Sequence, residues 1–122
     1  MNEKMYQEIY NELERYLDAY WEKLIIYLEY GEASYSFSFY RKNNGKYIKC
    51  YDLPDVKEDE LDESFGKIDK IVSGERMKEK HKWTNMTIIV ENTGKMSADI
   101  DYTDFSEGNY SYKKAWRNKY LV

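Results

Sequence analysis

Three aspartates lie within the short stretch DIDYTD, at positions 99, 101 and 104. Because side chains alternate between the two faces of a β-strand, Asp99 and Asp101 are expected to share one face, with Asp104 just beyond them. Carboxylate oxygens at this spacing suit a hard cation such as Mg²⁺, so a small metal-dependent hydrolase is one hypothesis. No histidine accompanies the aspartates, and alternating Asp is also typical of the solvated face of an antiparallel strand. We therefore expect neither a metal site nor a cofactor here.

Nucleophilic catalysis would depend on the single cysteine and the single histidine, Cys50 and His81. The two residues fall on different predicted elements, and a Cys–His enzyme also needs an orienting group and an oxyanion site. Cys50 is therefore expected to be a small buried residue, and His81 to lie near exposed carbonyl groups at a helix end. We expect no catalytic residues and no enzyme activity.

The cysteine count also bears on the cellular compartment. A single cysteine excludes an internal disulfide framework and is typical of the reducing cytoplasm. The first 25 residues carry many charges and no continuous apolar run, which argues against a signal peptide. No stretch of the sequence is apolar for long enough to span a membrane. The sequence thus predicts a cytoplasmic protein without a membrane partner.

Acidic residues are concentrated in two segments. Residues 52–63 carry seven carboxylates and one lysine, and residues 99–107 carry four carboxylates and no cation, although the whole chain has a net charge of only -4. The electrostatic field of such concentrated negative charge raises the rate at which a basic partner is bound. The same pattern also fits a solvated helix face and a solvated strand face. The acidic balance disfavours direct binding of nucleic acid.

The elements that position these residues follow from hydrophobic periodicity. Aromatic residues make up 17% of the chain, including 14 Tyr and 3 Trp, so Tyr and Trp must supply much of the buried area. The predicted helices span residues 2–20, 56 to 73 (or to 80 if Gly74 does not end the helix) and 111–122; the predicted strands span 23–30, 34–41, 46–51, 83–91 and 96–102. We expect a single α+β domain over residues 1–122, with one antiparallel sheet of about five strands, helices packed on one face, and the order α-β-β-β-α-β-β-α.

The acidic helix can be divided by role. Asp55 fits an N-cap, and Glu58 completes a capping-box-like pair with it. With Leu61 at the centre of the buried stripe, the helical period places Asp59 and Glu63 nearly opposite it and Asp62 on the flank. Helix formation does not require these three carboxylates, and together with Asp99, Asp101 and Asp104 they form the predicted partner-binding set.

Four motifs carry a family resemblance: WEK at 21–23, WTN at 83–85, TGK at 93–95 and WRNKYL at 116–121. In this order, and over most of the chain, the sequence resembles the YezG-like immunity proteins. The most specific part of the resemblance is the hairpin from WTN to TGK. The matching Trp and Gly residues are of structural type, so the resemblance transfers no functional residue to this sequence.

The resemblance implies an α+β antitoxin, a cytoplasmic partner that holds a secreted polymorphic toxin inactive inside the producing cell or its siblings. Such toxins are commonly nucleases. The expected function is therefore to bind the nuclease-like C-terminal domain of a cognate toxin and block its basic cleft, without direct contact to nucleic acid. The sequence does not determine the oligomeric state, and a monomer is the favoured expectation. A housekeeping protein-interaction module is a further alternative to the hydrolase hypothesis.

Overall fold

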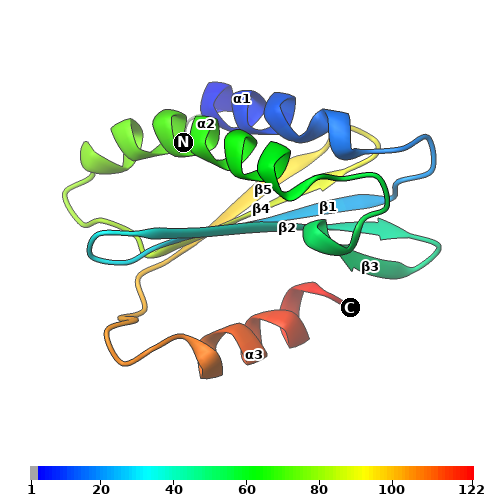
Figure 1. The fold of residues 1–122 in the computed structure, drawn as a ribbon. Helices are drawn as coiled ribbons and strands as arrows, with labels where there is room; N and C mark the ends of the chain where they lie inside the picture. Colours follow the sequence, from blue (N-terminus) through cyan, green and yellow to red (C-terminus); the bar gives the residue numbers. More distant parts are fainter. Residues whose placement is uncertain (1–2) are drawn as a thin grey trace.

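Three α-helices and five β-strands follow one another in the computed structural model, which describes residues 3–122 (Figure 1). Their order confirms the predicted α-β-β-β-α-β-β-α arrangement of an α+β protein. Two short 3-10 helices, η1 and η2, are interposed. The elements are α1 (Glu3–Leu13), η1 (Glu14–Tyr16), β1 (Lys23–Tyr30), β2 (Tyr35–Asn43), β3 (Lys46–Lys49), η2 (Cys50–Asp52), α2 (Glu58–Met77), β4 (Asn85–Glu91), β5 (Met96–Asp101) and α3 (Tyr110–Tyr120).

The five strands form one antiparallel sheet in the order β3-β2-β1-β4-β5. The strand β1 lies at its centre, with Ile26 opposite Phe39 of β2 on one side and opposite Ile88 of β4 on the other. Seven of the eight residues of β1 are buried. A run of β-branched and aromatic residues on both faces is typical of a strand that is covered from both sides.

The helices cover both faces of the sheet, which corrects the prediction that they pack on one face. Figure 1 shows α1 and α2 above the sheet and α3 below it. Alternate residues of β1 explain this arrangement, because Leu24, Ile26 and Leu28 join the core under α1 and α2, whereas Tyr27 packs against Trp116 of α3. The apolar character of both faces of β1 was the sequence signal that required a third helix on the second face.

The start of α2 differs from the predicted capping box. The helix begins at Glu58, and the residue before it, Lys57, makes no side-chain cap hydrogen bond. Asp55 adopts a left-handed backbone conformation with φ of 63°, so it lies in a turn outside the helix. Carboxylates in the first turn interact favourably with the helix dipole in place of a cap. Gly74 does not end the helix, which continues to Met77.

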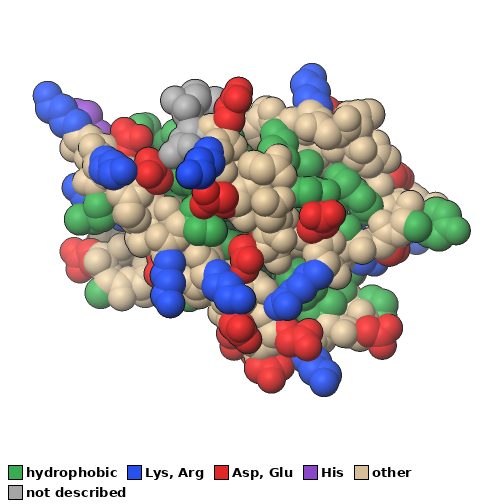
Figure 2. Space-filling view, turned by 90° about the horizontal axis from the view of Figure 1, so that it is seen from above, with side chains coloured by type: hydrophobic (Ala, Val, Ile, Leu, Met, Phe, Trp, Pro, Cys, Tyr) green, Lys and Arg blue, Asp and Glu red, His purple; other side chains and the backbone are tan. Residues whose placement is uncertain are grey.

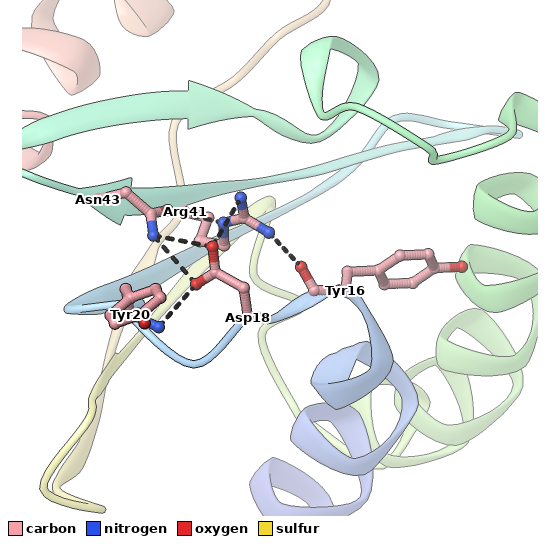
Figure 3. Close-up of polar contacts among 5 residues, drawn as sticks. All are labelled: Tyr16, Asp18, Tyr20, Arg41 and Asn43. Atoms are coloured by element: carbon pink, nitrogen blue, oxygen red, sulfur yellow. Dashed lines mark hydrogen bonds and ion pairs between the residues drawn. The ribbon is translucent and has the colours of Figure 1, made fainter.

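A polar cluster ties the connection after α1 to the β2–β3 hairpin (Figure 3). The Arg41 guanidinium donates to the Tyr16 carbonyl at 2.8 Å and lies 3.5 Å from the Asp18 carboxylate. The same carboxylate accepts hydrogen bonds from the Asn43 side chain and the Tyr20 backbone, each at 3.0 Å. Burial alone would raise the pKa of Asp18, but these hydrogen bonds and the charge of Arg41 lower it overall. The cluster fixes the hairpin relative to α1.

Candidate functional site

The six carboxylates of the predicted partner-binding set lie in two groups: three on α2, which covers one face of the sheet, and three on β5 and the loop after it, where Asp99 contacts α3 on the other face (Figure 1). Asp59, Asp62 and Glu63 form the α2 group, on a helix whose Phe65 ring lies 6.3 Å from that of Phe39 in β2. The β5 group comprises Asp99, Asp101 and Asp104; its strand is at the far edge of the sheet, and its Asp99 contacts α3. One compact interface therefore does not include both groups.

Each carboxylate of the β5 group has a partner within the chain. The Tyr120 hydroxyl donates to Asp99 at 2.6 Å, the Thr103 backbone N–H donates to Asp101 at 2.8 Å, and the Ser106 N–H donates to Asp104 at 2.9 Å. Hydrogen bonds from Thr103 lower the pKa of Asp101. These contacts fasten α3 and the loop before it, which gives the three aspartates a sufficient structural role.

The geometry does not favour chemistry at the β5 group or at Cys50. Within residues 3–122, no three His, Cys, Asp or Glu side chains are arranged to hold a metal ion, so the hydrolase hypothesis lacks a ligand set. Cys50 is fully buried, as predicted, and its burial raises the pKa of the thiol. A nucleophilic cysteine needs the opposite shift. His81 is exposed, beyond the end of α2.

The α2 group is more open, and its members differ in how they are engaged. Asp59 accepts a hydrogen bond at 3.0 Å from the backbone N–H of Glu60, in the first turn of the helix. Glu63 forms an exposed ion pair with Lys67 at 3.6 Å. Asp62 has no hydrogen bond or ion pair with any residue in the described part of the chain. Figure 2 shows acidic side chains interspersed with Lys and Arg on this face of the molecule.

Asp62 borders a shallow groove between α2 and the outer edge of β2. We call it the β2 edge groove; its lining residues are Tyr35, Ser36, Phe37, Tyr51, Asp62 and Phe65. Tyr51 is 46% exposed and Tyr35 is 40% exposed, although both rings pack on neighbouring Phe side chains. Burial raises the pKa of Tyr51, and the negative charges of Asp62 and Glu58 raise it further. The groove thus combines two accessible Tyr rings with a carboxylate that is free of intramolecular partners.

The sequence did not identify the two tyrosines of this groove. Apolar and Ser residues alternate over 34–39, and this alternation indicates that Tyr35 shares a face with Phe37 and Phe39, as it does in the structure. Its exposure arises because Tyr35 is the first residue of β2, beyond the end of the shorter β3. Tyr51 was predicted to lie in the returning strand, but it belongs to η2, which turns the chain away from the sheet. Periodicity alone carries no signal for either exposure.

No helix within residues 3–122 has both the length and the apolar content needed to cross a membrane.

The family model described as "Immunity protein YezG-like" matches residues 2–122. The protein named "Immunity protein YezG" from Bacillus spizizenii (strain ATCC 23059 / NRRL B-14472 / W23) is 30% identical over 131 residues, which cover 96% of this chain and 80% of that protein. The chain therefore belongs to the YezG-like family of immunity proteins.

Proposed function

We propose that the chain neutralises a cognate toxin by binding its C-terminal domain, and that this domain is a nuclease. The observation that carries the proposal is the position of Asp62, a carboxylate without a partner among the described residues, in the same groove as two exposed Tyr rings. Tyr is typical of binding hot spots. A nuclease must carry a basic cleft for phosphate groups, and a carboxylate surface competes for that cleft. Membership of an immunity family supports the existence of a toxin partner.

The interface is proposed at the α2 group rather than at the β5 group. Asp99, Asp101 and Asp104 already accept hydrogen bonds from Tyr120, Thr103 and Ser106, so a partner would have to compete with these contacts. Asp62 accepts no such hydrogen bond from the described residues, so a partner would not have to compete for it. Inhibition by occlusion needs no catalytic residue and no cofactor of its own. The free, buried thiol of Cys50 fits the reducing cytoplasm, where we place the encounter.

A binding titration across a salt series tests the proposal. The probe is the C-terminal domain of the toxin encoded beside this chain, made catalytically inactive. We expect Asp62→Lys to weaken binding by about tenfold or more at low salt, and to flatten the dependence of Kd on salt. Glu107→Lys is the matched control, because it makes the same charge change at an exposed residue in the loop before α3.

The outcomes separate the alternatives. Equal losses for both variants would mean that only net charge matters, which contradicts a defined interface at α2. If Asp62→Lys leaves the affinity unchanged and variants of the β5 group lose binding, the interface lies at the β5 group instead of at α2. No binding by the unmodified protein would contradict the proposed partner and favour a housekeeping interaction module.

A further inference from the structure

The outer edge of β2 is only partly covered by β3. The two strands pair from Tyr40 opposite Lys49 to Asn43 opposite Lys46, whereas β2 itself begins at Tyr35. After Lys49 the chain enters η2 and leaves the sheet. In the part of the chain that the structure describes, no strand pairs with the Tyr35–Phe39 end of β2 on the side away from β1.

The register determines which backbone groups point outward at this edge. The Gly31 N–H donates to the Ser34 carbonyl at 2.9 Å. Hydrogen-bonded pairs alternate in an antiparallel ladder, so Ser36 and Ser38 direct their N–H and C=O groups to β1. The intervening residues Tyr35, Phe37 and Phe39 direct theirs outward. The Phe39 backbone acts on the buried Cys50 thiol and lowers its pKa against the larger effect of burial. Within residues 3–122, no strand of the sheet pairs with the outward groups of Tyr35 and Phe37, which are therefore available.

We infer that this edge accepts an extended, cationic segment of the toxin as an added β-strand. The inference rests on the proposed function and names the contact through which it acts. Backbone groups of Tyr35 and Phe37 would supply the ladder, and the β2 edge groove would receive side chains of the added strand. Exposed strand edges are sites where a further strand pairs readily.

The acidic side chains near the outer edge of β2 favour a positively charged segment as the added strand. Asp62 lines the groove and lacks a partner among the described residues, and the charge of Glu58 reaches Tyr51 in the same groove. A segment with Lys or Arg at alternate positions would place its cations against these carboxylates. A second copy of this chain is disfavoured, since pairing two β2 edges would bring two acidic grooves together.

The edge strand β5 is the rival surface, and its chemistry is less suitable. It has no strand on its outer side within residues 3–122. However, Asp99 and Asp101 of this strand accept hydrogen bonds from Tyr120 and Thr103. The β5 edge therefore offers backbone groups without a free carboxylate, whereas the β2 edge offers both.

Residue-resolved amide hydrogen exchange tests the inference, measured on the full chain alone and in complex with the inactive toxin domain. We expect exchange at the Tyr35 and Phe37 amides to slow by at least about tenfold in the complex. A complex that forms without protection at these amides would overturn the strand addition and leave the proposed function standing. Absence of a complex would instead contradict the proposed function. Protection in the free chain that rises with its own concentration would identify a second copy as the occupant, which also overturns the inference.

A matched pair of variants at one position provides the second test. Tyr35→Ala and Tyr35→Pro both remove the ring, but only proline removes the outward N–H, and the bonds to β1 are kept in both. We expect Tyr35→Pro to bind the toxin domain about tenfold more weakly than Tyr35→Ala. Equal affinities for two variants with equal thermal stability would overturn the inference.

Discussion

Replacing Trp116 with alanine tests how α3 is held against the second face of the sheet. The indole is 3% exposed, and its ring centroid lies 4.9 Å from that of Tyr27 and 5.5 Å from that of Tyr40. Its N–H donates to the Thr87 hydroxyl at 2.8 Å. Removal of a buried Trp side chain costs about 3–5 kcal/mol. Small domains have a total free energy of unfolding of about 5–15 kcal/mol, so the loss is a large share.

The assay is equilibrium unfolding in urea, followed by circular dichroism. Trp116→Phe is the control, since it retains an aromatic ring and loses the hydrogen bond to Thr87; it should cost about 1–2 kcal/mol. The β2 edge groove, which contains Asp62, is on the face of the sheet opposite to α3. The folded fraction of both variants should therefore keep its affinity for the toxin domain. A loss below about 1 kcal/mol for Trp116→Ala would refute the packing argument, because it would mean that the indole contributes no more than one hydrogen bond.

Two further predictions concern stability. Gly74→Ala should stabilise the protein by about 1 kcal/mol in the same urea assay, because the glycine lies inside α2 and an added Cβ would meet no atom within 4 Å; a loss of stability would contradict a continuous helix through this position. Asp18→Asn should reduce thermal stability at neutral pH and have less effect in acid. The pKa of Asp18 is lowered in the folded state, so its contribution is present above the unfolded value of about 3.9 and is lost as the pH falls through the folded pKa. A difference in melting temperature that stays constant from neutral pH to about pH 2 would contradict this reasoning.

Periodicity determined much of the fold in advance. Apolar residues alternate with Ser over 34–39, which predicts that Phe37 and Phe39 are buried, and both are in the core. The spacing of three and four between apolar residues in α2 likewise predicts its buried face, which comprises Leu61, Phe65, Ile68 and Val72. These patterns are reliable because burial of alternate or 3.6-spaced side chains is itself the driving force for each element. The side of the sheet on which α3 packs was missed, since it depends on which face of β1 remains uncovered after α1 and α2 have packed.

The candidate site was less accessible from the sequence. The carboxylates Asp62 and Asp99 looked equivalent as acidic residues on predicted solvent-facing surfaces. They differ because Tyr120, more than 20 positions along the chain from Asp99, donates to it across the gap between α3 and β5, whereas nothing described in the structure donates to Asp62. Likewise, Asp55 matched the N-cap pattern, but the turn after Pro54 places it in a left-handed conformation. Long-range contacts of this kind carry no local sequence pattern.

The most direct test of the central claim is inhibition of the active toxin domain in a nucleic-acid cleavage assay, titrated with this chain. With the toxin domain kept below its Kd, we predict that the unmodified protein and Glu107→Lys halve cleavage at similar concentrations, and that Asp62→Lys requires a concentration at least about tenfold higher. Cleavage that continues at saturating, folded, unmodified protein would contradict the claim that the chain neutralises a nuclease. A half-inhibiting concentration for Asp62→Lys equal to that of the unmodified protein under these conditions would contradict the role assigned to Asp62.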